Sequence, residues 1–340
     1  MMSGRGLGHS GGTLDKLESI QGFDVQVSRD RFFNLLSTNG CAMIGQSATM
    51  VPADKKLYAL RDVTGTVECI PLIVASILSK KIAEGSQAIV FDVKTGSGAF
   101  MKSRDQARRL ARALTTVAGK IGIRTRALIT DMNQPLGCAT GNALEVRESI
   151  EVLRGSNLGD AKPSAVGCSS ADVRELSIQL TAHMLELSGE VKSIAEARKA
   201  ASRELSNGSA WKKFKEIVIA QGGSLEQIEH PERLPVAPRK LLWKAKRTGY
   251  LTQIRTDEIG RILVDLGAGR HVTSDRVDPA VGLVFLRKLG SKLKEGDSIV
   301  ELHAPSPAKI PDEKLHALER RFHAALQIGS ARKPNPKLIL

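Results

Sequence analysis

The sequence has few aromatic residues and contains no apolar run long enough to cross a membrane. Phe, Trp and Tyr make up only 4% of its 340 residues, and a glycine-rich start takes the place of the apolar core of a secretion signal. The four cysteines, Cys41, Cys69, Cys138 and Cys168, are far apart and form no C-x-x-C pair. We therefore expect a cytoplasmic protein with reduced thiols, without a membrane partner, a zinc site or a disulfide framework.

The charge is biased toward basic residues, with 50 Lys and Arg against 36 Asp and Glu and a formal net charge of +14. Such a bias raises the question of nucleic-acid binding. Aromatic platforms for base stacking are scarce, and the basic residues are spread along predicted helices instead of gathered in one arm. We expect no nucleic-acid partner but a solvated basic surface that attracts phosphate anions. Retention on DNA with a steep salt dependence would indicate the alternative.

The first half of the chain alternates between apolar runs typical of strands and helical patterns. Hydrophobic residues make up 41% of the sequence, and its length allows two or three domains. The predicted strands cover residues 23–27, 41–44, 87–93 and 125–130, and the predicted helices cover 29–38, 66–83 and 104–120. This alternation predicts an α/β fold with a mostly parallel sheet covered by helices.

The second half begins with helices and ends with short strands. Helices are predicted over residues 173–187, 193–205, 209–221 and 256–266, and strands over 249–254, 282–286 and 297–303. A composition shift near residues 234–238 separates the two kinds of pattern. We expect an α/β core over residues 1–233, a smaller C-terminal α+β domain over 234–305, and a helix with a basic tail over 306–340.

The stretch Ser3–Glu18 combines glycines, hydroxyls, an arginine and a histidine ahead of a predicted helix. Glycines allow a close backbone approach, and the unpaired amides of a helix start suit an anion. Thr13 is a good candidate for the N-cap. The local chemistry therefore predicts an ordered loop that binds phosphate or a carboxylate, with a flexible tail as the alternative.

The same stretch, S-G-R-G-L-G-H-S-G-G-T-L-D-K-L-E, resembles the signature of thymidine and pyrimidine-nucleoside phosphorylases. The resemblance implies that Ser3 and Thr13 offer hydroxyls to phosphate. Ser10 departs from the pattern, because relatives more often carry Thr there. We interpret His9 as a residue that packs the loop, because the family's proposed proton donor is a different histidine.

Ser76 and Lys80 are four residues apart in a predicted helix, so both lie on one face and can meet the same ligand. The plain alternative is a solvated lysine beside Lys81. The motifs K-K-L-Y-A-L-R-D and I-P-L-I-V-A-S-I-L-S-K-K resemble the family's pyrimidine-binding pattern. That resemblance implies that Tyr58, Arg61, Ser76 and Lys80 bind the nucleoside. It also implies that Arg61 and Lys80 are catalytic through the charge growing on the base.

The stretch D-M-N-Q-P-L-G-C-A-T-G-N-A-L-E-V-R-E, Asp131–Glu148, resembles the monovalent-cation site of the family. The implied ligands are the carbonyls of Leu136 and Ala139 and the carboxylate of Glu148, and the implied ion is potassium. An exposed helix carboxylate is the alternative for Glu148. Inorganic phosphate is the expected co-substrate, and we expect no organic cofactor.

The resemblance implies a glycosyltransferase of pyrimidine salvage. The reaction is the reversible phosphorolysis of thymidine, with uridine and deoxyuridine as further candidates, to free base and (deoxy)ribose 1-phosphate. Relatives are homodimers. The base-binding residues serve both thymidine and uridine, so the sequence does not separate these preferences.

In the family, a helical segment and a Lys-His-Ser plus glycine-rich phosphate loop precede the signature, and we expect the sequence beginning at Met1 to lack both. The family's dimer contact and further ligands of the phosphate and the cation lie in those parts. The alternative function is therefore a truncated, catalytically inactive remnant or gene fragment of the enzyme. The DNA upstream of Met1 would distinguish a misplaced start from a true loss.

Overall fold

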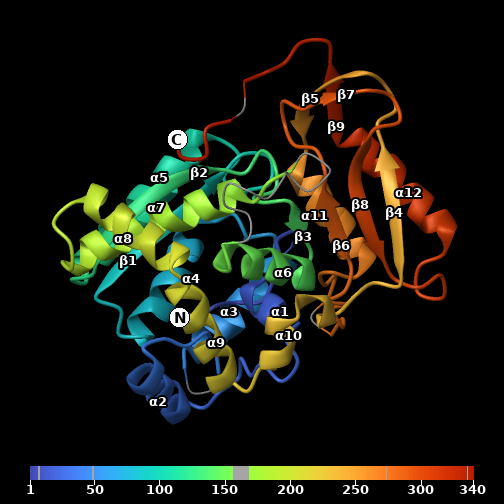
Figure 1. The fold of residues 1–340 in the computed structure, drawn as a ribbon. Coiled ribbons are helices and arrows are strands. Elements are labelled where there is room, and N and C mark those ends of the chain that lie inside the picture. Colours follow the sequence, from blue (N-terminus) through green and yellow to red (C-terminus); the bar gives the residue numbers. More distant parts are fainter. Residues whose placement is uncertain (7, 48–49, 156–167, 273, 335) are drawn as a thin grey trace.

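The computed structural model describes residues 1–340 except 7, 48–49, 156–167, 273 and 335, and except the side chains of residues 55, 58, 59, 62 and 63. An α/β part and an antiparallel C-terminal part lie side by side, with α6 and β3 between them (Figure 1). The helices are α1 Thr13–Leu17, α2 Arg29–Asn39, α3 Pro52–Val63, α4 Ile70–Ala83, α5 Arg104–Lys120, α6 Asn142–Leu153, α7 Ala171–Ser188, α8 Ile194–Ser206, α9 Ser209–Ala220, α10 Leu225–Glu229, α11 Thr256–Leu266 and α12 Asp312–Ala324. The strands are β1 Ala88–Thr95, β2 Arg124–Asp131, β3 Ala139–Thr140, β4 Arg239–Lys244, β5 Gly249–Ile254, β6 Gly282–Phe285, β7 Lys292–Leu293, β8 Ser298–Ala304 and β9 Leu326–Gly329.

The α/β part is built on the parallel pair β1 and β2, in register from Ala88 opposite Arg124 to Thr95 opposite Asp131. Apolar side chains of α4, β1 and α5 form its core, among them Val74, Leu78, Phe91, Val93, Leu110 and Leu114. A capping box between Ser103 and Gln106 starts α5. The predicted α/β class with a parallel sheet and a smaller C-terminal part is confirmed.

Two short strands predicted near the start are not strands in the structure. Residues 23–27 have no strand conformation, and the 41–44 segment contributes one isolated bridge, between Met2 and Ile44. The buried amide of Gln221 replaces the expected ladder: it donates to the carbonyls of Asp24 at 2.9 Å and Met43 at 2.8 Å, and accepts the Met43 N–H at 2.9 Å. A side chain thus satisfies backbone groups that a neighbouring strand would otherwise bond.

The C-terminal part contains two antiparallel sheets, ordered β3-β6-β8-β4 and β7-β5-β9. They share one large apolar core with α11 and α12, built around residues such as Leu251, Leu283, Phe285, Val300 and Phe322. β3 belongs to the sequence of the α/β part, yet it pairs with β6 through Ala139 opposite Val284 and Thr140 opposite Leu283. The two parts are therefore joined by a shared sheet, and the boundaries near residues 233 and 305 stay predictions.

Several element limits differ from those expected. Neither α3 nor β4 is predicted from the sequence. The helix α4 begins at Ile70, four residues later than predicted. The last helix, for which the sequence predicts residues 312–327, ends at Ala324, and the residues after it form β9 against β5. The small, polar residues 161–171 predict a loop, and most of them lie outside the described residues. Among the helices that the structure describes, none combines the length and apolarity needed to cross a bilayer.

Candidate functional site

In the described part of the Ser3–Glu18 segment, which excludes residue 7, charged side chains hold the loop together. The Asp15 carboxylate accepts the Gly6 N–H at 2.9 Å, the Arg5 guanidinium at 2.9 Å, and the guanidinium of Arg270 from the C-terminal part at 2.9 Å. A Cβ on Gly12 would collide with the backbone of Arg5 and Gly6, so this close crossing requires glycine. The anion at the centre of the loop is therefore a carboxylate of the chain itself.

Ser3 and Thr13 lie at the two ends of this loop. The Ser3 N–H donates to the Ile44 carbonyl at 2.9 Å, and the Ser3 side chain is half-buried. Thr13 is exposed and is the first residue of α1, whose N-cap is Gly12. The expectation that Thr13 caps the helix is wrong, because Gly12 already occupies the extended cap position, so the Thr13 hydroxyl is not used as a cap.

His9 faces the β1–α5 connection instead of the loop interior. Its Nε2 lies 3.0 Å from the Gly98 carbonyl, and its ring meets the edge of Phe100 with centroids 5.5 Å apart. A Cβ on Gly260 would collide with the His9 carbonyl. These contacts give His9 the surroundings of a packing residue.

A cavity of about 400 Å³ lies between α3 and α4. Its walls are mostly apolar, and its polar lining includes Asp54 and Arg61 from α3 and Ser76 and Ser79 from α4. Arg61 is buried, and its guanidinium donates to the Val67 carbonyl. An apolar hollow with a few fixed polar groups is the usual form of a small-molecule site.

Lys80 lies beside this cavity, because it follows Ser76 by four residues and so shares its face of α4. Its ammonium donates to Ser76 Oγ at 2.8 Å and to Asp54 Oδ2 at 2.7 Å. The alternative of a solvated lysine is wrong, because only 7% of Lys80 is exposed. Burial lowers the pKa of Lys80, and the hydrogen bond and charge of Asp54 act in the opposite direction.

Asp54 is the residue that sequence reasoning missed at this site. It belongs to the segment Met50–Asp54, for which the sequence predicts only a turn, and it is 94% buried. The missing signal is tertiary, because Asp54 and Lys80 are 26 residues apart and belong to different helices. Tyr58 is part of α3, but its side chain lies outside the described residues.

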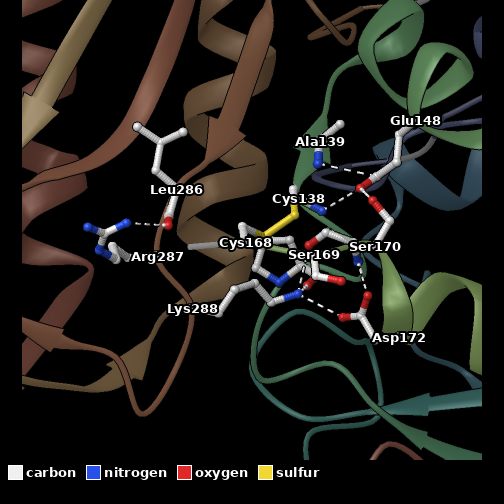
Figure 2. The surroundings of a disulfide bond; sticks show 12 residues. Cys138, Ala139, Glu148, Cys168, Ser169, Ser170, Asp172, Leu286, Arg287 and Lys288 are labelled. Atoms are coloured by element: carbon white, nitrogen blue, oxygen red, sulfur yellow. Dashed lines mark hydrogen bonds and ion pairs between the residues drawn. A yellow bond between two sulfur atoms is a disulfide. The ribbon is translucent and has the colours of Figure 1, made fainter. Parts of the chain in front are cut away.

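The residues predicted to hold a cation lie where the β2–β3 loop, residues 132–138, meets α6 (Figure 2). The carboxylate of Glu148 accepts the Cys138 N–H at 2.7 Å, the Ala139 N–H at 3.2 Å and the Ser170 hydroxyl at 2.6 Å. Only 8% of Glu148 is exposed, so the alternative of an exposed helix carboxylate is wrong. Burial raises the pKa of Glu148, and the three hydrogen bonds oppose that rise.

This arrangement fits a monovalent cation in part. A carboxylate has about four acceptor positions, and the three donors on Glu148 leave room for one further partner. Ala139 presents its N–H to Glu148. Within the described residues, no cluster of three His, Cys, Asp or Glu side chains is arranged to hold a metal ion.

A disulfide joins Cys138 to Cys168, with Cα atoms 6.1 Å apart (Figure 2). The expectation of four reduced thiols is therefore wrong for these two residues, whereas Cys41 and Cys69 are free. The bond ties the β2–β3 loop to the segment that leads into α7, two residues before Ser170. Thirty residues separate the two cysteines, so no local spacing indicates that they meet.

Comparisons with known proteins match both parts of the chain. Residues 1–211 match the family model described as "Glycosyl transferase family, a/b domain", and residues 250–323 match "Pyrimidine nucleoside phosphorylase C-terminal domain". Pyrimidine-nucleoside phosphorylases of Staphylococcus aureus strains USA300 and NCTC 8325 are each 48% identical to the chain over 303 residues. That of strain bovine RF122 is 47% identical over the same length. Each alignment covers 89% of this chain and 67% of the relative.

Proposed function

The chain belongs to the glycosyl transferase family of the pyrimidine-nucleoside phosphorylases, and from this premise we propose that it phosphorolyses thymidine, uridine and deoxyuridine. Enzymes of this family are pentosyltransferases and use phosphate as the co-substrate. The products are the free base and ribose or deoxyribose 1-phosphate. The observation that carries the proposal is the buried Lys80 ammonium, set between Ser76 and Asp54 beside a cavity that Arg61 also lines.

In the proposed reaction, a phosphate oxygen forms a bond to the anomeric carbon while the bond from that carbon to the base nitrogen breaks. The transition state resembles an oxocarbenium ion. The electron pair of the broken bond goes to the base, whose negative charge Arg61 and Lys80 stabilise by hydrogen bonds. Ser76 and Tyr58 orient the ring, and binding in a mostly apolar cavity strengthens these charge contacts.

Asp54 has a distinct part in this proposal. A carboxylate 2.7 Å from the ammonium favours the charged form of Lys80, which burial alone would disfavour. A charged lysine is a stronger donor to the leaving base than a neutral amine. We therefore propose that Asp54 keeps Lys80 protonated and holds its ammonium next to Ser76.

The phosphate and cation sites complete the proposal. Ser3 and Thr13 contribute hydroxyls to phosphate. The carbonyls of Leu136 and Ala139, with the remaining acceptor position of Glu148, contribute to a potassium site that positions the loop and takes no step in the chemistry. A homodimeric assembly and a cytoplasmic location stay predictions from the sequence resemblance.

The test is to incubate the purified 340-residue chain with thymidine or uridine and to follow free base by chromatography, with and without phosphate. Phosphate-dependent release of base from wild type, strongly reduced in Lys80→Ala, supports the proposal. Release that needs no phosphate would indicate hydrolysis and overturn it. Absence of release from a folded wild type would instead support the alternative, a catalytically inactive member of the family.

A further inference from the structure

The side chain of Lys288 reaches from the C-terminal part into the β2–β3 loop (Figure 2). Lys288 follows β6, and its ammonium donates to the carbonyls of Pro135 at 2.6 Å and Gly137 at 2.7 Å. The third bond goes to Oδ2 of Asp172 in α7 at 2.8 Å. The ammonium has three donors and no acceptor, so three oxygens account for all its hydrogen-bonding capacity.

Carboxylates bind the amides of the same loop. Asp172 Oδ1 accepts the Gly137 N–H at 3.1 Å, and Glu148 accepts the N–H groups of Cys138 and Ala139. The Gly137–Cys138 peptide group is bound at both ends, its carbonyl by the Lys288 ammonium and its N–H by the Glu148 carboxylate. Each charge polarises this peptide group in the direction that strengthens the bond to the other.

Further bonds join the same loop to the C-terminal part. The Phe285 N–H donates to the Cys138 carbonyl at 2.7 Å, and the Leu289 N–H donates to Gln134 Oε1 at 3.0 Å. Pro135 and Gly137 are buried and Lys288 is mostly so, whereas Lys292 a few residues later is exposed. Lys288 is thus less exposed than this nearby lysine.

We infer that Lys288 is a positioning residue whose ammonium serves as a tethered monovalent cation for the β2–β3 loop. It fixes the carbonyls of Pro135 and Gly137, and so keeps the amides of Cys138 and Ala139 on Glu148. It also locks the C-terminal part onto the α/β part at this point. Without it, two buried carbonyls and Oδ2 of Asp172 lose this donor, and unsatisfied buried acceptors destabilise the contact between the two parts.

A free cation of suitable size should replace the tethered one. Backbone carbonyls and a carboxylate are the oxygen ligands that bind small monovalent cations. Ammonium and methylammonium keep three or more N–H donors, whereas tetramethylammonium has the same charge and none. Recovery of stability by ammonium and methylammonium, but not by tetramethylammonium, separates a cation site from a general effect of ionic strength.

The experiment compares Lys288→Met with wild type and with the control Lys292→Met, which removes an exposed charge four residues later, in β7. Thermal unfolding is measured in ammonium, methylammonium and tetramethylammonium chloride at equal ionic strength. We expect Lys288→Met to lower Tm by about 5 °C or more, as for loss of a largely buried ion pair. Ammonium or methylammonium should recover a large part of that loss, tetramethylammonium should not, and Lys292→Met should behave as wild type. A loss equal in all three salts, or no loss, overturns the inference.

Asp172→Asn provides a second variant. In its background Lys288→Met should lower Tm by less than it does in wild type, because the two residues share one of the three bonds of the ammonium. Additive effects overturn the inference. If Lys288→Met does not fold, amide hydrogen exchange of Asp172→Asn is compared with that of wild type instead. Faster exchange at residues 137–139 supports the inference, and unchanged exchange there overturns it.

A final arm rests on the proposed function and measures KM for phosphate and nucleoside together with kcat. We expect Lys288→Met to change these parameters and methylammonium to restore them in the same order as Tm. An inactive wild type would contradict the proposed function but leave the unfolding experiment intact, so the two failures are distinguishable. Normal kinetics in a variant whose Tm is cation-dependent would limit Lys288 to stability and overturn its role in positioning the site.

Discussion

The Lys80 ammonium lies 2.7 Å from the Asp54 carboxylate, and both side chains are almost fully buried. Removing one partner of such a pair leaves an uncompensated charge, which is strongly destabilising. The pair therefore links the stability of α3 and α4 to the site they form. Two kinds of measurement, unfolding and turnover, are needed to separate these roles.

Lys80→Ala should lower kcat/KM by about 2–4 kcal/mol, the scale for loss of one electrostatic stabiliser of the transition state. Steady-state kinetics on protein shown to be folded by circular dichroism give the value. Lys56→Ala, an exposed lysine of α3, is the matched control and should leave kcat/KM unchanged. Normal turnover in folded Lys80→Ala would refute the assignment of Lys80 to the base.

Asp54→Asn should reduce kcat by shifting Lys80 toward its neutral form. Burial lowers the pKa of Lys80 and Asp54 opposes that shift, so the variant should lose activity at a lower pH than wild type. The pH profile of kcat measures the alkaline limb for both proteins. An alkaline limb that does not move toward lower pH would show that Asp54 does not control the protonation of Lys80.

Glu148 should lower the free energy of unfolding as the pH rises above 4.5, the ordinary pKa of a glutamate. Burial raises the folded pKa, so the native state binds more protons than the unfolded state between 4.5 and the folded pKa, and the slope of unfolding free energy against pH is negative in that window. Glu148→Gln should remove this component. Urea unfolding from about pH 4 to 7 measures it, since the slope reports proton uptake. Glu151→Gln, an exposed carboxylate of α6, should retain the wild-type slope.

Gly137→Ala should destabilise the protein more than Gly122→Ala. Both glycines have a left-handed conformation, with φ of 69° and 80°, and alanine there costs about 1–2 kcal/mol. A Cβ at Gly137 would also collide with the Glu148 carboxylate, whereas at Gly122 it would meet nothing within 4 Å. The difference between the two urea unfolding energies isolates the contact with Glu148. Equal losses would show that the carboxylate moves away without cost.

Cys138→Ser should lower the unfolding free energy by about 3–4 kcal/mol, the scale expected for closing a loop of 30 residues. Thiol titration in denaturant should find two reactive cysteines in unreduced wild type and four after reduction. Cys41→Ser, which removes a free thiol, should leave stability close to wild type. Four reactive thiols without reductant would mean that the bond does not form in the purified protein.

Local sequence determined the features that depend on neighbours along the chain. Ser76 and Lys80 share a face because the helical repeat places residues four apart together. The strands β1 and β2 and the helix α5 follow from apolar runs and a serine cap. The Ser3–Glu18 motif also placed the chain in its family. The prediction of strands near residues 23–27 and 41–44 was wrong, because the side chain of the distant Gln221 bonds backbone groups of both segments.

Only the tertiary structure decided which distant groups meet. Asp54 reaches Lys80 across 26 residues, Cys138 reaches Cys168 across 30, and Lys288 reaches the Gly137 carbonyl across 151. Each contact depends on how helices and sheets pack after their local structure is set, and no periodicity or spacing encodes it. Burial then fixes the chemistry, because the same lysine or glutamate has its ordinary pKa in water and a shifted pKa inside the fold.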